Sequence, residues 1–256
     1  MIIDSHTHIY LPEFAGDRKE MIQRALDAGV NKMYMPNIDS ESIALLTRIE
    51  EDYEGICLPM MGLHPCSVLE NYKKELAIIE KRLSDGNYFA VGEIGLDYYW
   101  DKTHIEIQKE SFKLQIKWAK ELNLPIVIHS RDSIQDCIDI VKEAKDEKLN
   151  GIFHCFGGSV EEANQIIDLG FYLGIGGVLT YKKSGLDETL KSIDLKHLVL
   201  ETDAPYLTPV PFRGKRNEPA YLTYIVQRLA EVKEVSVEEL CMITTENANR
   251  VFNKVK

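Results

Sequence analysis

Short apolar segments alternate with longer amphipathic segments along almost the whole chain. Several of the short segments, such as 126–128 and 198–200, are apolar at consecutive positions. Consecutive apolar positions are typical of parallel strands that are covered on both faces. The predicted strands are Ile2–Asp4, Lys32–Pro36, Ile56–Gly62, Phe89–Glu93, Ile126–His129, Gly151–His154, Phe171–Ile175 and His197–Glu201.

The amphipathic segments between the strands have the apolar spacing of helices. Two of them begin with the spacing of a capping box, Ser159 to Glu162 and Ser236 to Glu239. The predicted helices are Asp17–Ala28, Ser40–Glu51, Glu70–Leu83, Ile105–Leu122, Ser133–Lys145, Val160–Leu169, Asp187–Ser192, Ala220–Glu231 and Ser236–Met242.

Eight strands that alternate with helices over 256 residues predict an α/β protein, a (β/α)8 TIM barrel with outer helices. We expect a single domain, 1–256. A doubly wound open sheet is the alternative fold. Its nucleotide-binding versions are disfavoured, because no Gly-x-Gly-x-x-Gly follows the first strand and the chain has no Walker loop.

The balance of charge limits the classes of partner. The chain carries 30 Lys+Arg against 41 Asp+Glu, a formal net charge of −11. This balance argues against a broad basic surface for nucleic acid. It does not exclude a nuclease whose phosphate contacts are local or are made by metal ions. The hydrophobic share of 45% is enough to build a core and argues against a disordered chain.

Cysteine spacing and the uncharged segments bear on the compartment. The five cysteines include no Cys-x-x-Cys pair, which argues against a disulfide framework and favours a reducing cytosol. The longest segment without Asp, Glu, Lys or Arg, 55–69, is too short to cross a bilayer. The N-terminus has no signal-peptide pattern. We expect a cytoplasmic protein with no membrane association, either a monomer or a weak oligomer.

Histidines gather at the predicted strand ends. Five of the seven histidines lie at or just after the carboxyl end of a strand, where the loops of a barrel converge on one face. His6 and His8 are two residues apart and therefore share a face, so both imidazoles can reach one metal ion. The alternative is that two polar residues simply end a strand. The five histidines are His6, His8, His64, His129 and His154.

Glu93 closes the fourth predicted strand and has Gly92 and Gly95 beside it. A carboxylate inside a concave barrel mouth is costly if it is unpaired. Bridging two cations would remove that cost, and a buried salt bridge is the alternative.

His129 and His154 end two successive predicted strands and are candidate ligands of a second metal ion, although each alone is compatible with a hydrogen-bonded core histidine. Asp203 follows the eighth strand, which neighbours the first strand in a closed barrel. Asp203 can therefore approach an ion held by the first two histidines and take a proton from the attacking water. Imidazole and carboxylate donors suit Zn²⁺, Mn²⁺ or Mg²⁺. Two such ions would lower the pKa of a shared water.

Seven motifs in this order resemble the TatD family of metal-dependent hydrolases, which belongs to the amidohydrolase-like barrels. The resemblance covers residues 3–252 and implies a metal-dependent deoxyribonuclease, with 3′–5′ exonuclease action on single-stranded DNA. The motifs are His6-x-His8, Gly62-Leu63-His64-Pro65, Gly92-Glu93-Ile94-Gly95-Leu96-Asp97, His129-Ser130-Arg131, His154-Cys155-Phe156-Gly157-Gly158, Glu201-Thr202-Asp203-Ala204-Pro205 and Arg213-Gly214-Lys215-Arg216-Asn217-Glu218-Pro219.

The resemblance also implies ligands for two divalent ions. One ion would be held by His6, His8, Glu93 and Asp203, and the other by Glu93, His129 and His154. Glu93 would then bridge the two ions, and Asp203 and Glu93 are the candidate catalytic residues.

Other polar residues are candidates for substrate contacts. His64 is not needed to complete the ligand set of either ion. We expect it to contact a substrate phosphate or leaving group, or else to make a supporting hydrogen bond. Arg131 shares the face of His129 and could hold a phosphate in a bidentate contact; a salt bridge inside the mouth is the alternative. Glu201 could orient a metal-bound histidine.

The segment Pro209–Pro219 contains a compact basic cluster, in which Arg213 is the preferred phosphate contact. An ordinary loop salt bridge between Arg216 and Glu218 is the alternative interpretation of this segment. The aromatic residues 98–100 could stack on an unpaired base or pack as a lid.

The sequence therefore predicts a two-metal hydrolase of ester bonds, a 3′–5′ exodeoxyribonuclease acting on DNA with single-stranded or frayed ends. The alternative is a hydrolase of another ester or amide, such as a D-aminoacyl-tRNA deacylase or a small-molecule amidohydrolase. The basic loop favours a nucleic acid. A non-catalytic scaffold is disfavoured, because buried carboxylates and histidines without a metal are costly.

Overall fold

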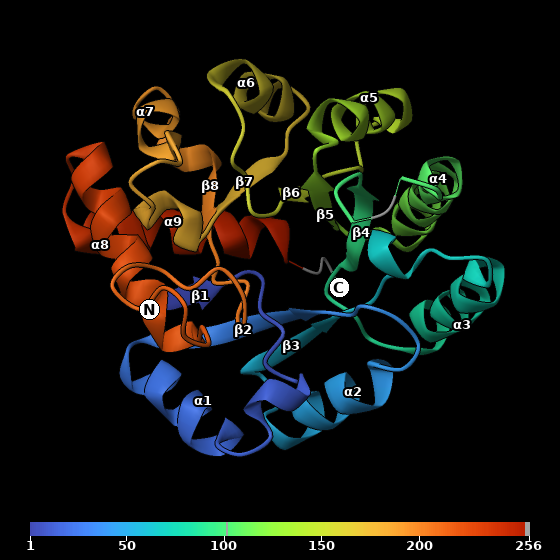
Figure 1. Ribbon diagram of the computed structural model, residues 1–256, viewed down its shortest axis with the longest axis horizontal. Helices are drawn as coiled ribbons and strands as arrows, with labels where there is room; N and C mark the ends of the chain where they lie inside the picture. Colours follow the sequence, from blue (N-terminus) through green and yellow to red (C-terminus); the bar gives the residue numbers. More distant parts are fainter. Residues whose placement is uncertain (101, 254–256) are drawn as a thin grey trace.

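Parallel strands surround the centre of the molecule and helices lie outside them (Figure 1). The computed structural model describes residues 1–100 and 102–253. The first three strands pair in the order β1-β2-β3 and the other five in the order β4-β5-β6-β7-β8. The strands are β1 Ile2–Asp4, β2 Val30–Pro36, β3 Cys57–Met60, β4 Val91–Asp97, β5 Ile126–Arg131, β6 Gly151–Phe153, β7 Tyr172–Ile175 and β8 Leu198–Leu200.

Main-chain contacts join the two sheets at both of their junctions. Met61, just after β3, pairs with Val91 of β4 in a parallel bridge. At the other junction the Ser5 amide donates to the Leu200 carbonyl at 2.9 Å. The arrangement is consistent with the predicted (β/α)8 barrel, although the strands pair as two sheets. The predicted single domain, 1–256, includes residues 101 and 254–256, which lie outside the described residues, and it stays a prediction.

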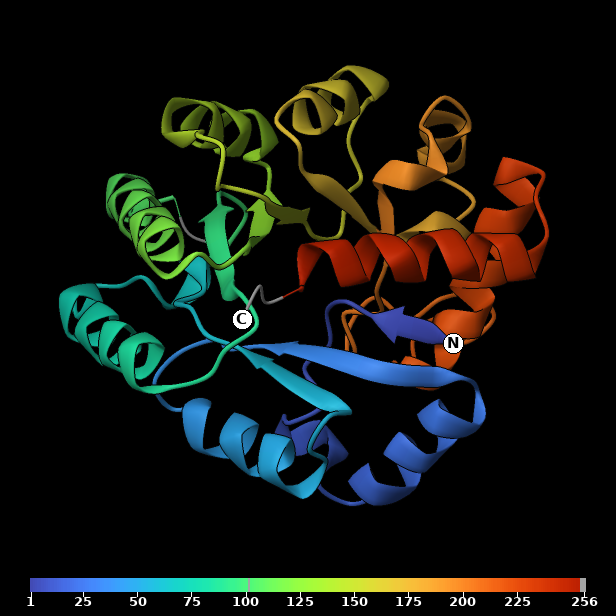
Figure 2. The same cartoon turned by 180° about the vertical axis from the view of Figure 1, so that it is seen from behind.

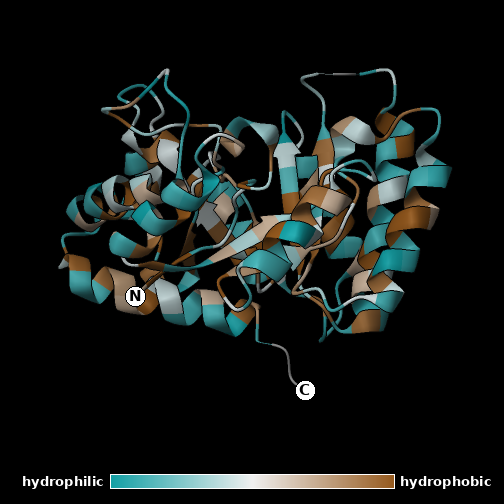
Figure 3. Cartoon of the chain, turned by 90° about the horizontal axis from the view of Figure 1, so that it is seen from below, coloured by the Kyte–Doolittle hydropathy of each residue, from teal (hydrophilic) through white to brown (hydrophobic). Residues whose placement is uncertain are grey.

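Helices connect the strands and turn their polar sides outward (Figure 3). The Ser159 and Glu162 capping box at the start of α6 is present, and the Ser236 hydroxyl accepts from the Glu239 amide at the start of α9. No described helix is long and apolar enough to span a bilayer. The helices are α1 Arg18–Asp27, α2 Ile43–Asp52, α3 Tyr72–Asp85, α4 Ile105–Leu122, α5 Ile134–Ala144, α6 Val160–Asp168, α7 Leu186–Lys191, α8 Leu222–Lys233 and α9 Val237–Val251.

Helix α9 covers the amino ends of the strands (Figure 2). It runs to Val251, so the predicted helix 236–242 was too short. The extension buries Val251 and Phe252 in a second apolar cluster, to which most strands contribute a side chain, and Phe252 stacks on Tyr34 at 3.7 Å between ring centroids. Since α9 closes this end, the open mouth lies at the carboxyl ends of the strands.

Strand β4 continues to Asp97, so the prediction that Glu93 closes it was wrong. Its pairing with β5 resumes after a register shift between Val91 and Ile94, and the shift contains Glu93. Gly95 permits the continuation: its φ is +136°, and a Cβ there would overlap the carbonyl oxygen of His129. A bulge of this kind redirects a side chain without ending the strand.

Two buried glutamines of α4 fix loops at the mouth. Gln115 accepts from the Leu63 amide at 2.8 Å and donates to the Leu63 carbonyl at 3.1 Å. Gln108 holds both main-chain groups of Asp97 in the same way, at 2.9 and 3.2 Å. The helix therefore positions the segments that carry His64 and Asp97.

Candidate metal centre

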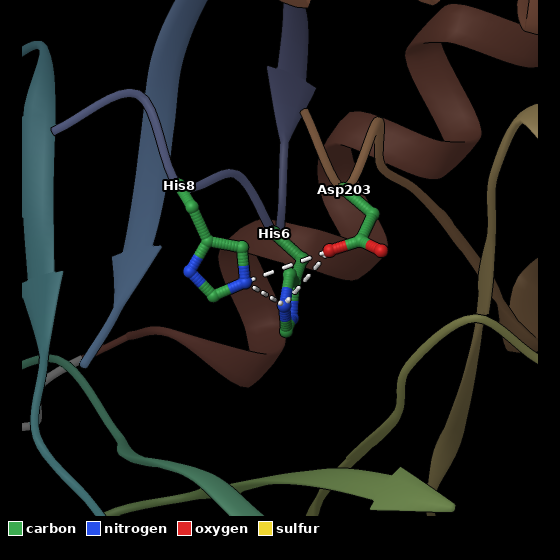
Figure 4. A group of neighbouring side chains, drawn as sticks. All are labelled: His6, His8 and Asp203. Carbon is green, nitrogen blue, oxygen red and sulfur yellow. Dashed lines mark hydrogen bonds and ion pairs between the residues drawn. The ribbon is translucent and has the colours of Figure 1, made fainter. Parts of the chain in front are cut away.

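The first histidine pair and Asp203 meet at the mouth (Figure 4). The Nε2 atoms of His6 and His8 are 3.2 Å apart, and Asp203 Oδ1 lies 3.6 and 3.5 Å from them. The Asp203 amide donates to the His6 carbonyl at 2.9 Å, so the main chain itself joins the end of β8 to the end of β1. All three side chains consequently face one small volume.

Asp4 forms hydrogen bonds with both segments that meet here, the one after β1 and the one after β8. Its carboxylate accepts from the His6 amide at 3.2 Å and from the amide and hydroxyl of Thr202 at 3.0 and 2.5 Å. Complete burial raises the pKa of Asp4 to about 8, although these hydrogen bonds oppose the rise. Asp4 thus holds the segments on both sides of the first histidine pair.

Glu93 lies between this group and a second group of histidines. Its Oε2 is 3.2 Å from His6 Nε2 and 3.5 Å from His8 Nε2. Its Oε1 is 2.8 Å from His129 Nδ1 and 3.0 Å from His154 Nε2. Each oxygen of one buried carboxylate therefore faces a different pair of imidazoles.

These side chains form three groups that could each hold a metal ion. In each group the donor atoms lie within 4.8 Å of one another: His6, His8 and Asp203; His6, Glu93 and His154; and His64, Glu93 and His129. Imidazole nitrogens with carboxylate oxygens form a donor set that suits Zn²⁺ or Mn²⁺. The residues present thus fit divalent cations.

Hydrogen bonds on the far side of the rings fix which nitrogen faces the centre. The Tyr10 hydroxyl donates to the Pro36 carbonyl at 2.6 Å, so it must accept from His8 Nδ1 at 3.0 Å. The proton on Nδ1 leaves the lone pair of His8 Nε2 directed at the centre. Sequence reasoning missed Tyr10, although it lies two residues beyond His8 and its spacing could have drawn attention to it.

Carboxylates lie behind the rings of the second pair. His129 Nε2 lies 2.9 Å from Asp97 Oδ2, and His154 Nδ1 lies 3.2 Å from Glu201 Oε1. Glu201 is fully buried and also accepts from the Cys155 amide at 2.6 Å. Asp97 was not among the predicted site residues, because its strand was expected to end at Glu93; its spacing of four residues from Glu93 was the available signal.

His64 differs from the other histidines. Its Nδ1 accepts from the Cys66 amide at 3.0 Å, so the proton of the neutral ring lies on Nε2. Nε2 is 3.5 Å from Glu93 Oε1. In this tautomer the side chain presents an N–H donor to the centre. To act as a metal ligand in the third group, His64 would need a lone pair on Nε2, and it would then lose the hydrogen bond from Cys66.

Without metal, protons on the histidines balance the charge of the carboxylates. Burial alone would raise the pKa of Glu93, but the surrounding histidines hold that pKa well below its usual range. Burial would likewise lower the pKa of His8, but the carboxylates of Asp203 and Glu93 raise it to about 9. Burial would also lower the pKa of His154, but the carboxylates of Glu93 and Glu201 raise it well above its usual value. Metal binding must therefore displace protons from these rings.

The predicted substrate contacts lie around the mouth. Arg131 is exposed and its guanidinium carbon is 3.8 Å from the centre of the Tyr99 ring. Arg213 is exposed, and its guanidinium carbon lies 4.0 Å from the centre of the Tyr181 ring. Neither side chain joins the histidine and carboxylate cluster, and each has an aromatic ring beside it.

Arg216 has a different environment from Arg213. It makes two contacts with Asp17, at 2.7 and 2.8 Å, and lies 3.9 Å from Glu218. Glu218 is itself paired with Arg24 at 2.6 Å. This network joins the loop after β8 to α1, so the expected alternative of a salt bridge within the loop describes only a minor part of it.

The model of the family described as TatD related DNase matches residues 3–253. The chain belongs to the TatD family. A relative in Bacillus subtilis strain 168, named as the uncharacterised metal-dependent hydrolase YabD, is 42% identical over 253 residues, which cover 98% of this chain and 99% of YabD. This TatD-family protein is accordingly a metal-dependent hydrolase.

Solved structures agree with this assignment. The TatD homologue YjjV of Escherichia coli K12 has a TM-score of 0.93 at 30% identity and covers 98% of both chains. A mutant organophosphorus hydrolase has a TM-score of 0.68 at 12% identity, over 98% of this chain and 92% of its own. The second likeness concerns the fold alone.

Replacing Tyr10 by phenylalanine tests the orienting hydrogen bond. We expect Tyr10→Phe to weaken Mn²⁺ or Zn²⁺ binding about 10- to 100-fold, because His8 loses the acceptor that fixes its tautomer. Calorimetric titration of the metal-free protein measures the change. Tyr34→Phe, at another buried tyrosine, is the matched control and should bind metal like the parent. Equal affinities in all three proteins would contradict the orienting role.

Proposed function

We propose that this chain is a two-metal phosphodiesterase that removes nucleotides from the 3′ end of single-stranded or frayed DNA. The observation that supports it most is the position of Glu93, whose two carboxylate oxygens face two different histidine pairs. A bridging carboxylate suits two cations that share one reacting centre. In this proposal His6, His8, Glu93 and Asp203 hold one ion, and Glu93, His129 and His154 hold the other.

Bound divalent cations would lower the pKa of a coordinated water and offset the charge of a phosphate. Asp203 supplies the base. Its Oδ1 lies 3.5 Å from His8 Nε2, and neighbouring histidines keep the pKa of Asp203 below its usual value in spite of burial. The carboxylate is therefore ionised and placed to accept the proton that the attacking water loses.

The remaining polar residues orient the substrate. His64 presents its Nε2–H toward the centre, where it can donate to a phosphate oxygen or to the leaving oxygen. Arg131 and Arg213 provide exposed guanidinium groups at the mouth of a chain whose net charge is −11. Local cations of this kind support an anionic polymer as substrate. Glu201 holds the ring of His154 from behind.

A nuclease assay tests the proposal. Protein loaded with Mn²⁺ or Mg²⁺ should shorten 5′-labelled single-stranded DNA progressively from its 3′ end, and EDTA should abolish the reaction. Asp203→Asn should lower the rate at least about 100-fold, because the base is lost. Asp85→Asn, at an exposed residue that ends α3, is the matched control. A ladder that persists in Asp203→Asn would contradict the assigned base.

Failure of the metal-loaded protein to cleave DNA in this assay would overturn the DNA proposal. It would favour a substrate with another ester or amide bond, and charged tRNA is the next substrate to test.

The role of Arg213 is measured by salt dependence. Arg213→Ala should weaken DNA binding and reduce the slope of log affinity against log salt by about 1, because one phosphate contact is lost. Metal content should stay at the parent value. Arg48→Ala, at an exposed arginine of α2, is the control. An unchanged slope in Arg213→Ala would remove the loop after β8 from the substrate site.

A further inference from the structure

A pocket of about 360 Å³ lies beside the metal centre, where the chain leaves β5 and β6. These two strands pair in parallel, so the segments that follow them lie next to each other (Figure 1). The volume is within the range of about 300–1,000 Å³ that small-molecule sites occupy. Two of its lining residues, Arg131 and His154, already have proposed roles, but no group of the substrate has yet been assigned to the space itself.

The pocket adjoins the metal centre at His154. His154 lines the pocket, and its Nε2 lies 3.0 Å from Glu93 Oε1. The pocket and the metal centre therefore share a wall, and a group bonded to a phosphate at the centre would lie next to the pocket.

One wall of the pocket is held in place by aromatic rings. Arg131 lines the pocket, and its guanidinium carbon stands 3.8 Å from the centre of the Tyr99 ring and 5.4 Å from that of Trp100. Both rings are largely exposed, at 54% and 69%. Stacking on these rings restricts the guanidinium plane, which itself offers a flat surface to a nucleobase.

The other walls combine apolar and polar groups. Ile134 and Phe156 are apolar lining residues, and Ser130 and Asp132 are polar ones. A nucleoside matches this combination, since it has apolar base faces together with N–H and O–H donors at its edges. An aliphatic acyl or amino-acid side chain would leave the polar groups without partners.

Gly157 lines the pocket without contributing a side chain to it. A Cβ at Gly157 would meet no atom within 4 Å, and its φ lies outside the left-handed region. Gly158 differs, because a Cβ there would crowd Glu162 Oε2 at 2.6 Å. A larger side chain at Gly157 can therefore be built without backbone strain, and it would add bulk to the lining of the pocket.

We propose that this pocket binds the nucleoside attached to the scissile phosphate, with Arg131 along one face and Gly157 leaving the necessary space. The inference rests on the proposed phosphodiesterase function. In this proposal the base and sugar of the substrate bind in the pocket, and their contacts add to the affinity that the metals provide.

Two chromogenic esters with the same leaving group test it: thymidine 5′-(4-nitrophenyl) phosphate and methyl 4-nitrophenyl phosphate. We expect the parent protein to prefer the thymidine ester through a lower KM. Gly157→Val should reduce the ratio of kcat/KM between the two esters at least tenfold, because valine fills the space of the nucleoside. Gly16→Val is the matched control, since Gly16 has the same open surroundings outside the pocket. It should keep the parent ratio.

Binding of thymidine 5′-monophosphate, measured by calorimetry, separates this inference from the proposed function. If neither ester is hydrolysed, the phosphodiesterase proposal fails, and the pocket is then judged by binding alone. Parent protein that binds the nucleotide at least tenfold more tightly than Gly157→Val supports the pocket. Equal binding, or no binding by the parent, overturns it. Hydrolysis of both esters with a ratio unaffected by Gly157→Val overturns the pocket and leaves the phosphodiesterase intact.

Discussion

The burial of the Glu93 carboxylate among histidines is the constraint on which the site depends. A buried carboxylate is tolerated only with compensating charge, and here protonated His8, His129 and His154, or bound cations in their place, supply that charge. The position requires the register shift in β4, which in turn requires Gly95 beside the carbonyl of His129. The backbone conformation of β4 therefore determines where the carboxylate lies in the centre.

The two ends of the strands have different roles in the fold. At the amino ends, α9 inserts Val251 and Phe252 into an apolar cluster that contributes stability. At the carboxyl ends, polar side chains dominate and hold one another in place. Tyr10 fixes the tautomer of His8, Asp97 and Glu201 hold the rings of His129 and His154, and Asp4 joins the segments on both sides of the first pair. This division is typical of (β/α)8 enzymes.

Much of this arrangement could be predicted from the sequence, because parallel strands bring their carboxyl ends together whatever their spacing along the chain. That rule places His6, His129 and His154 at one face before any distance is known. The end of β4 was predicted wrongly, because two glycines are ordinary signals of strand termination and here serve close packing. The length of α9 was underestimated, because its last turns are polar except where they meet the strands. The spacing of Tyr10 from His8 only points to Tyr10, because its role depends on the Pro36 carbonyl; the tautomer of His64 likewise depends on the Cys66 amide, which no side-chain pattern reveals.

The proposed bridging by Glu93 can be measured directly by electron paramagnetic resonance of protein titrated with Mn²⁺. A carboxylate shared between two ions about 3.5–4 Å apart would give a spin-coupled Mn²⁺ pair at two equivalents. The same titration of Glu93→Gln should give no coupled signal. Two independent Mn²⁺ signals in the parent protein, or a coupled pair that survives in Glu93→Gln, would contradict the shared carboxylate at the centre of this account.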